Sequence, residues 1–417
     1  MLEPQRADPA ASAMRSAPAD DVTREYAYYR QVFAGQRMPF AFLDLDLLDA
    51  NVQQVVARAG QKRIRVASKS VRSVGALQRI LAADERMIGV MCLTAREAVY
   101  LASQGIADVL IGYPCSAAPD VADVAQATQA GAHITLMVDD LTQVERIDAV
   151  ARERDVRLPL CLDIDLSLDL PGLHFGTWRS PLRTVEQARP IIERILASDH
   201  LTLDGVMGYE AQIAGVGDNY PRQAVKNAIV RALKRRSVGL VAQRRAAVVA
   251  MIRSLGGELR FVNGGGSGSM DTTQAEDVVT ELTVGSAFYS PALFDHYRAF
   301  RFAPAAGFAV EIVRRPAANR YTCLGGGYVA SGAAGADRLP QPYLPAGARL
   351  DPLEGAGETQ TPVIYTGDIS LAIGDPIFFR HAKAGELCER FTRLLLVSRG
   401  AVVGEATTYR GDGQCFL

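Results

Sequence analysis

Short apolar segments alternate with longer helical segments along most of this 417-residue chain. Each of the runs AFLDLD, RIRVASK, MIGVMCL, DVLIGYP, HITLMVD, LPLCLDIDL, LTLDGVMGYE and LRFVNGGG is typical of a buried strand. About eight strand–helix units in roughly 255 residues match the size of a (β/α)₈ barrel. The pattern therefore predicts an α/β fold with a TIM-type barrel over residues 36–300, and an open doubly wound sheet is the alternative.

The character of the chain changes near residue 300. Short β-prone runs separated by Gly, Pro and Asp predict a C-terminal, mostly β domain over residues 301–417. Residues 1–20 are rich in Ala, Pro and Asp and have no periodicity, which predicts a disordered lead. Residues 21–35 are expected to pack on either domain.

Charge and cysteine content narrow the class of protein. The chain has 45 Lys and Arg against 46 Asp and Glu, and this balance argues against a general nucleic-acid binder. No apolar run reaches the roughly 18 residues that span a bilayer, and the N-terminus lacks the apolar region of a signal peptide. Six scattered cysteines suit free thiols in a reducing compartment. We therefore expect a cytoplasmic protein without a membrane or nucleic-acid partner.

Lys69 closes the apolar run RIRVASK at the start of a helical segment. Catalytic groups of barrels lie at the carboxyl ends of strands, and a lysine among apolar neighbours loses its proton easily and can form a Schiff base. A solvated lysine between a strand and a helix is the alternative interpretation.

A glycine- and serine-rich segment, NGGGSGS, follows the last apolar run of the predicted barrel. Successive backbone N–H groups and two hydroxyls suit a phosphate, and barrels often bind phosphate after their last strands. The segment matches neither the dinucleotide fingerprint nor the P-loop. A flexible loop is the alternative.

His381 and Cys388 lie close together in HAKAGELC. An imidazole and a thiolate suit Zn²⁺ or a similar divalent ion, although Cys388 could equally be a core residue. Glu210 and Gln212 follow a strand-like run and could be catalytic or could cap a helix.

Two further charged segments have simple interpretations. Asp44 and Asp46 alternate with apolar residues, which indicates a strand whose polar side faces the barrel mouth or solvent. The basic run from Lys234 to Arg245 lies within a long helical segment near 222–255 and is expected to be a solvated face.

In this order the features resemble the fold-type III pyridoxal-phosphate enzymes, whose barrel is like that of alanine racemase. Within this group of enzymes, the features resemble the D-threonine aldolase and D-serine dehydratase branch. The resemblance covers residues 36–417 and rests on MPFAFLDLDLLDAN, Lys69, GVMCLTAREAVYLASQGIADVLIG, GYEAQ, NGGGSGS and GDPIFFRHAKAGELC.

The resemblance implies a role for each candidate residue. Lys69 would bind pyridoxal 5'-phosphate covalently, and Tyr209 would lie near its pyridine ring. The residues that would bind or flank the phosphate are Gly265, Gly266, Ser267 and Tyr289. His381 and Cys388 would match the ligands of a divalent metal ion, Mn²⁺ or Zn²⁺.

The chain departs from the family pattern in two places. The family commonly has an arginine that contacts the pyridine nitrogen, and the register of DIDLSLDLPGLHFG puts His174 in its place. His381 and Cys388 are also more widely separated than the family's usual His and Cys, with Lys383 and Glu386 between them.

The activity that the resemblance implies is a lyase reaction on a β-hydroxy D-amino acid, by retro-aldol cleavage or by elimination with deamination, assisted by a metal. A metal-independent amino-acid racemase or epimerase and a non-catalytic pyridoxal-phosphate-binding protein are the alternatives. The resemblance also implies a homodimer with a small amino-acid substrate.

Overall fold

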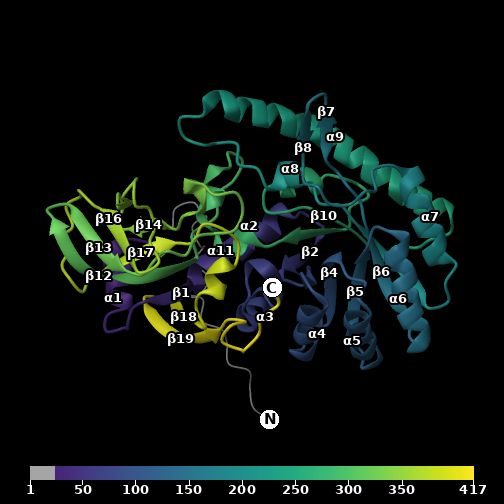
Figure 1. Ribbon diagram of the computed structural model, residues 1–417, viewed down its shortest axis with the longest axis horizontal. Coiled ribbons are helices and arrows are strands. Elements are labelled where there is room, and N and C mark those ends of the chain that lie inside the picture. The colour runs from purple at the N-terminus through teal and green to yellow at the C-terminus, as the bar shows by residue number, and fades with distance from the viewer. Residues whose placement is uncertain (1–23) are drawn as a thin grey trace, which may run out of the picture.

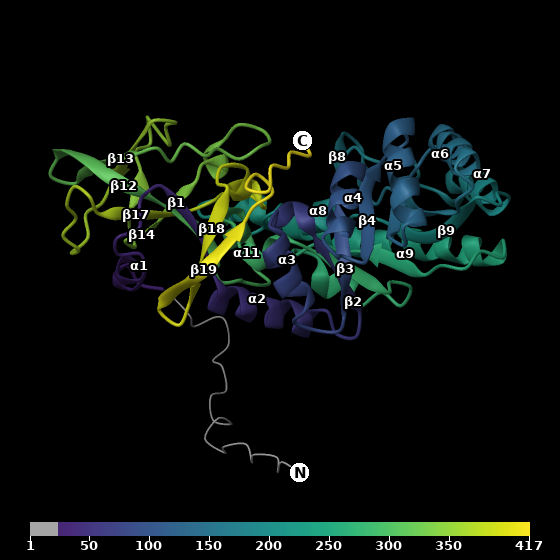
Figure 2. The ribbon, with the colours of Figure 1, turned by 90° about the horizontal axis from the view of Figure 1, so that it is seen from below.

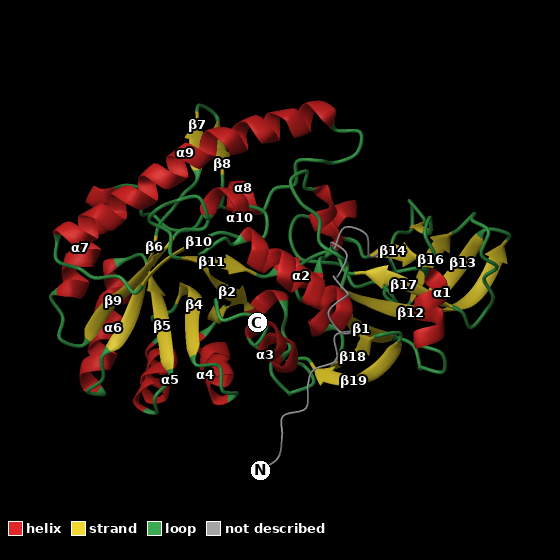
Figure 3. Ribbon diagram, turned by 180° about the vertical axis from the view of Figure 1, so that it is seen from behind, coloured by secondary structure: helices red, strands yellow, loops and turns green. Residues whose placement is uncertain are grey.

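The computed structural model describes residues 24–417, and it has two parts that lie side by side along the longest axis of the molecule (Figure 1). One part is a barrel of parallel strands surrounded by helices, and the other is almost entirely strands and loops (Figure 3). The lead expected over residues 1–20 lies outside the described residues. Within residues 24–417 no helix is long and apolar enough to cross a membrane.

Eight strands close the barrel in the order β10-β11-β2-β3-β4-β5-β6-β9, and all neighbours are parallel. Their bounds are β2 (Arg63–Ala67), β3 (Met87–Cys92), β4 (Asp108–Pro114), β5 (His133–Val138), β6 (Leu158–Asp163), β9 (Leu201–Met207), β10 (Phe261–Gly264) and β11 (Glu281–Val284). The predicted (β/α)₈ barrel is confirmed, and the open sheet is excluded. Because the strands all run the same way, their carboxyl ends meet at one mouth.

Helices surround the barrel on its outer side (Figure 2). Their bounds are α2 (Leu45–Arg58), α3 (Val74–Leu81), α4 (Ala95–Ser103), α5 (Ala118–Gln129), α6 (Leu141–Glu153), α7 (Val185–Leu196) and α9 (Ala224–Ser254). Side-chain caps start several of them. Thr94 Oγ1 accepts a bond from Glu97 N at α4, and Thr184 and Gln187 form a capping box at α7.

The segment expected to be the first barrel strand belongs to the other part of the protein. β1 (Phe40–Asp44) pairs antiparallel with β12 (Ala306–Ala317) and parallel with β18 (Arg393–Ser398). The eighth barrel strand is instead β11, within ELTV, which was not predicted as a strand. All five residues of β1 are buried, and a run buried on both faces looks the same in a barrel as in any covered sheet.

Of the two alternatives for Asp44 and Asp46, the barrel mouth is wrong for both residues, and solvent is correct in part for Asp46, whose side chain is 36% exposed. The buried Asp44 carboxylate caps α2 by accepting bonds from the backbone N–H groups of Asp46 and Leu47. Asp46 accepts a bond from Ser398 Oγ at 2.8 Å. Both carboxylates therefore join α2 to the β domain.

The β domain is one nine-stranded sheet with the main order β15-β16-β13-β12-β1-β18-β19, and β14 and β17 branch from β12. The remaining bounds are β13 (Arg320–Leu324), β14 (Gln341–Leu344), β15 (Arg349–Leu350), β16 (Gln360–Ile364), β17 (Pro376–Arg380) and β19 (Ala401–Thr407). Residues 21–35 contain α1 (Tyr26–Val32), which packs on this domain through edge and tilted contacts of Tyr26 and Tyr29 with Phe378. The predicted β character after residue 300 is confirmed.

Candidate active site

Lys69 lies at the mouth of the barrel, where the sequence predicts it. β2 ends at Ala67, and the short helix η3 (Ser68–Ser70) carries the lysine. It lines a cavity of about 320 Å³ together with residues from the carboxyl ends of other strands. The Lys69 ammonium donates a hydrogen bond to Tyr113 Oη at 2.7 Å.

Tyr113, on β4, was not identified from the sequence. Burial raises the pKa of this phenol, but the charge and hydrogen bond of Lys69 and the charge of Arg179 outweigh burial, so the net pKa lies below its ordinary value. Lys69 and Tyr113 therefore form a pair that can share a proton at the cavity wall.

The glycine-rich segment after β10 forms the opposite wall of the cavity. Gly265, Gly266 and Ser267 line it, and Gly265 has a φ of +94°, a conformation that favours glycine. A Cβ at Gly266 would lie 2.8 Å from the Ala214 Cβ atom and 3.2 Å from the Tyr209 ring. The loop thus approaches its neighbours so closely that only glycine fits.

A second turn faces this loop. Gly285 and Ser286, which follow β11 at the start of α11 (Ser286–Tyr289), also line the cavity. Ser267 Oγ accepts a bond from Ala287 N at 3.0 Å and so joins the two turns. Backbone and hydroxyl donors from both turns suit a phosphate, and with Lys69 in the same cavity the residues fit pyridoxal phosphate.

Buried ionic contacts hold the glycine loop from behind. Glu210 Oε1 accepts bonds from Ser269 Oγ at 2.8 Å and from Thr273 Oγ1, and Glu210 Oε2 lies 3.1 Å from Arg245 Nη2. Glu210 is therefore a structural residue of the loop. Arg245 and Lys234 are buried in ion pairs, so the expected solvated face of α9 is wrong at these positions. Arg235 and Arg236 are exposed, as expected.

We expect the Gly266→Ala variant to bind pyridoxal phosphate at least about tenfold more weakly, because the new methyl group would push the loop from Ala214 and Tyr209. Fluorescence titration of the cofactor-free protein would measure this affinity. Gly239→Ala is a matched control, because a Cβ there meets no atom within 4 Å. Equal affinities for both variants would contradict the expected role of the loop.

Aromatic rings and a cation form the third wall. Tyr209 lies in the cavity wall, and burial raises the pKa of its phenol to about 12. The Arg179 guanidinium lies 5.6 Å from the centre of the Tyr209 ring and 5.1 Å from that of Tyr113. Arg179 is thus a cation in this wall of the cavity.

His174 and Gln212 do not line this cavity. His174 lies in the hairpin of β7 (Leu168–Leu170) and β8 (Leu173–Phe175), where its ring stacks on Trp178 with 3.9 Å between centroids and its Nδ1 lies 2.6 Å from Asp169 Oδ1. Gln212 Nε2 donates to Leu166 O at 2.6 Å and so fastens α8 (Ala211–Ala214) to a loop. Both residues are engaged in local structure.

Asp163 ends β6 beside Arg179, with 3.5 Å between Asp163 Oδ2 and Arg179 Nη2. Burial raises the pKa of this carboxyl to about 7, with Arg179 opposing and Asp139 and Asp165 adding to the rise. Between about pH 4 and pH 7 the folded protein binds a proton that the unfolded chain releases. The contribution of Asp163 to stability therefore falls as the pH rises through this window.

We expect the Asp163→Asn variant to gain stability over the wild type as the pH rises. The difference in the free energy of unfolding should be small near pH 4 and should grow by on the order of 1.4 kcal/mol for each pH unit through this window, to a few kcal/mol near pH 8. Chemical denaturation at both pH values measures it. A difference independent of pH would contradict the expected protonation of Asp163 in the folded protein.

Tyr289, His381 and Cys388 do not line the 320 Å³ cavity. The rings of Tyr289 and His381 meet edge to face at 6.4 Å. Neither ring nitrogen of His381 makes a hydrogen bond of standard geometry with the described residues, and neither does Tyr289 Oη. Burial and the neighbouring Arg380 charge lower the pKa of His381 to about 4, so the imidazole is neutral.

The pair His381 and Cys388 does not amount to a metal site in this structure. Cys388 Sγ donates to Val71 O at 3.2 Å, and burial raises the pKa of the thiol to about 12, which keeps the sulfur protonated. Among residues 24–417 no group of three or more His, Cys, Asp or Glu side chains could hold a metal ion. Two protein donors are fewer than the three or four that zinc sites usually have, so the residues present do not complete a site for a divalent ion.

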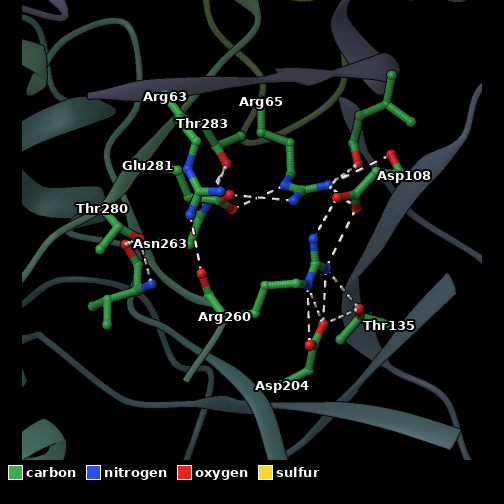
Figure 4. Close-up of polar contacts among 12 residues, drawn as sticks. Arg63, Arg65, Asp108, Thr135, Asp204, Arg260, Asn263, Thr280, Glu281 and Thr283 are labelled. Atoms are coloured by element: carbon green, nitrogen blue, oxygen red, sulfur yellow. Dashed lines mark hydrogen bonds and ion pairs between the residues drawn. The ribbon is translucent and has the colours of Figure 1, made fainter. Parts of the chain in front are cut away.

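Charged side chains from several barrel strands and the residues before them contact one another, as Figure 4 shows. The fully buried Arg65 donates to Glu281 Oε1 at 2.9 Å and to Asp108 Oδ1 at 2.7 Å. Arg260 Nη2 continues the network to Asp204 Oδ2 at 2.8 Å. Arg260 Nη1 also contacts Asp108 Oδ2, so each of the two arginines contacts two carboxylates.

The side-chain amide of Asn263 connects this network of charged side chains to the cavity. Asn263 Nδ2 donates to Glu281 Oε1 and to Thr283 Oγ1, both at 2.8 Å, and Asn263 and Thr283 line the cavity. Glu281 accepts bonds from both Arg65 and Asn263, which sets the orientation of the amide. The floor of the cavity is therefore held by the barrel core.

Comparison with known proteins agrees with this geometry. A 3-hydroxy-D-aspartate aldolase of Paracoccus denitrificans (strain Pd 1222) is 26% identical over 256 residues, which are 61% of this chain and 60% of that protein. A second such aldolase of Paracoccus denitrificans is 28% identical over the same shares. The matched region thus spans about three fifths of the curated relatives.

Solved structures share the whole fold. D-threonine aldolase from Filomicrobium marinum superposes with a TM-score of 0.75 at 19% identity, covering 91% of this chain and 96% of that one. D-threo-3-hydroxyaspartate dehydratase from Delftia sp. HT23 has a TM-score of 0.70 at 18% identity, with 92% and 99% covered. The family described as "Alanine racemase, N-terminal domain" matches residues 43–289, and the chain belongs to this family.

Proposed function

We propose that this protein is a pyridoxal-phosphate-dependent lyase that acts on β-hydroxy D-amino acids, by retro-aldol cleavage or by elimination with deamination. The observation that carries the proposal is the position of Lys69 in one cavity with the glycine loop. The aldolases of Paracoccus denitrificans support the same class of reaction.

When bound, pyridoxal phosphate supplies an electron-withdrawing ring that stabilises negative charge on the substrate. Lys69 would hold the aldehyde of the cofactor through its amine, and the turns at Gly266 and Gly285 would hold the phosphate. Arg179 holds a positive charge at the wall between Tyr113 and Tyr209. These residues line one cavity and would together fix the cofactor in it.

Lys69 and Tyr113 are the groups that can move protons in this cavity. In its ionised form, Tyr113 can take up, across the 2.7 Å hydrogen bond, the proton that the Lys69 ammonium must lose before its amine can act as a nucleophile. The lowered pKa of Tyr113 raises the share of this phenolate, which is the form that can accept the proton of a substrate hydroxyl. Proton transfer at this pair is therefore our proposal for the acid–base step.

Metal assistance, which the resemblance implies, is not part of this mechanism. Cys388 Sγ donates to the Val71 carbonyl, and among the described residues His381 and Cys388 belong to no group of three or more His, Cys, Asp or Glu side chains that could hold a metal ion. We derive no step through a metal ion. The homodimer and the cytoplasmic location stay predictions, and light scattering after size-exclusion chromatography would measure the oligomeric state.

The proposed function is tested by incubating the protein with pyridoxal phosphate and a panel of D- and L-β-hydroxy amino acids, with and without EDTA, Mn²⁺ or Zn²⁺. We expect visible absorption of covalently bound cofactor and turnover of D-amino acids that survives EDTA. Aldehyde with glycine would identify cleavage, and ammonia with an oxoacid would identify elimination.

Three other outcomes would contradict parts of the proposal. A protein that binds the cofactor but only exchanges the Cα proton in D₂O would be a racemase or epimerase. A protein that binds it and changes no amino acid would be a carrier. Loss of turnover with EDTA and its return with Mn²⁺ would show that the metal expectation is correct after all.

A further inference from the structure

A second cavity of about 840 Å³ adjoins the first. Lys69, Tyr113, Lys383 and Ala384 line both cavities, so the two meet beside the proposed catalytic lysine. Its other walls come from residues 328–331 and from the loop 381–390 of the β domain. The junction therefore lies beside any amino acid that binds at Lys69.

Lys383 is fixed at the junction by the packing of its own loop. A Cβ at Gly385 would lie 2.7 Å from Lys69 O, so this loop lies directly on the backbone of Lys69. Cys388 Sγ contacts Val71 O at 3.2 Å, and Arg72 Nη1 lies 2.6 Å from Glu389 Oε1. Three separate contacts thus join the loop to residues 69–72.

The Lys383 ammonium has only neutral partners. Its Nζ donates to Ser331 Oγ at 2.9 Å and to Ser331 O at 3.3 Å. In the described part of the chain it forms no ion pair with a carboxylate within 4.0 Å. Glu386 is nearby, but its carboxylate accepts bonds from Ser331 N at 3.1 Å and from Ser331 Oγ.

The other cations around the first cavity have partners. Arg179 lies 3.5 Å from Asp163, Arg338 lies 3.8 Å from Asp337, and Lys69 is bonded to Tyr113. A positive charge that is partly buried and held by neutral oxygens binds an anion favourably, because a carboxylate replaces weaker contacts with a charge-assisted bond. Among the described residues that line the first cavity, Lys383 is the cation whose partners are serine oxygens alone, and it is thus available for a ligand. Arg390, which is exposed in the wall of the second cavity, also forms no ion pair within 4.0 Å with a described residue.

We propose that Lys383 and the junction around it form a subsite for a carboxylate on the side chain of the substrate, so that the enzyme prefers acidic β-hydroxy amino acids. This inference rests on the proposed function, because it assumes an amino acid bound at Lys69. The ligand chemistry is a second carboxylate next to a hydroxyl-bearing carbon. Lys383 thereby determines specificity, whereas Lys69 carries the reaction.

Binding of malate and of lactate to the cofactor-loaded protein tests the subsite, because malate differs from lactate by one additional carboxylate. We expect the wild type to bind malate more tightly than lactate. Lys383→Met should weaken malate binding by about 10- to 100-fold, the loss typical of a charge-assisted contact, and so remove the preference. Lys383→Arg retains the charge and should retain most of the preference.

Isothermal titration calorimetry measures both ligands without turnover. Lys383→Gln serves as a second neutral variant if Lys383→Met does not fold. Equal losses for malate and lactate, or no loss for malate, would overturn the subsite even in a protein that binds pyridoxal phosphate and cleaves amino acids. Failure to bind the cofactor would overturn the proposed function. If this cofactor-free protein still bound malate more tightly than lactate, and Lys383→Met removed the difference, the subsite would still be supported.

In the same variants, kcat/KM for an acidic β-hydroxy amino acid should fall relative to that for one with a methyl side chain. A role of Lys383 in loop structure alone would lower both values by the same factor. A constant ratio across wild type, Lys383→Met and Lys383→Arg would therefore contradict the proposal.

Discussion

The Lys69→Ala variant should lose covalent binding of pyridoxal phosphate and lose activity by on the order of 10³-fold or more, because it removes the amine proposed as the cofactor's attachment point. The side chain lies at the mouth of the barrel with its Nζ 2.7 Å from Tyr113 Oη, and among the described residues no other lysine lines the first cavity except Lys383. Borohydride reduction followed by peptide mass spectrometry measures the attachment.

The control for this experiment is the other lysine of the cavity. Lys383→Met should still carry the reduced cofactor on Lys69, since Lys383 is bonded to Ser331. Cofactor found covalently bound in the Lys69→Ala variant, or found on Lys383 in the wild type, would show that the attachment point is wrong. Lys69→Arg should also fail, because a guanidinium retains the charge but is not a nucleophile at neutral pH.

The Arg65→Met variant should lower the free energy of unfolding by about 3–5 kcal/mol, the cost of leaving one partner of a buried ion pair without its counter-charge. The side chains of Arg65 and Glu281 have no exposed surface, and Asp108 loses a 2.7 Å contact as well. Urea denaturation followed by circular dichroism measures the change.

Two matched variants separate the buried pair from ordinary surface charge. Arg393→Met removes one partner of the exposed Arg393–Glu405 pair and should cost less than about 1 kcal/mol. Arg65→Met combined with Glu281→Gln should recover part of the loss, because the uncompensated carboxylate is gone. If Arg65→Met alone lowered the free energy of unfolding by no more than Arg393→Met does, the importance of the network would be contradicted.

The barrel could be predicted from the sequence because most of its strands are long apolar runs followed by helices. β11 was missed because its four residues include Glu281, whose carboxylate is hidden by Arg65 and Asn263 from other strands. The run RIRV contains one indication that Arg65 belongs to a polar face of its strand. Arg63 and Arg65 are two positions apart and so point to the same face of β2. Partners from distant strands cannot be recognised from one such run.

The candidate site was predicted best where residues follow a strand directly, as Lys69 and the glycine loop do. His174 was assigned by register against a family pattern, but the hairpin of β7 and β8 places it next to Asp169 and leaves Arg179 at the cavity. Tyr113 lies near the end of a strand as well and gave no motif. The roles of His381 and Cys388 depend on contacts with Arg380 and Val71, which spacing alone cannot show.

The position of β1 has a consequence for the order in which this protein is built. β1 lies between β12 and β18, so it cannot be paired until residues 306–309 and 394–397 have been made. The barrel strands between them leave the ribosome earlier, and domains generally fold as they emerge. An apolar strand therefore stays unpaired until partners more than 250 residues away have been made, and an unpaired apolar strand is prone to aggregate.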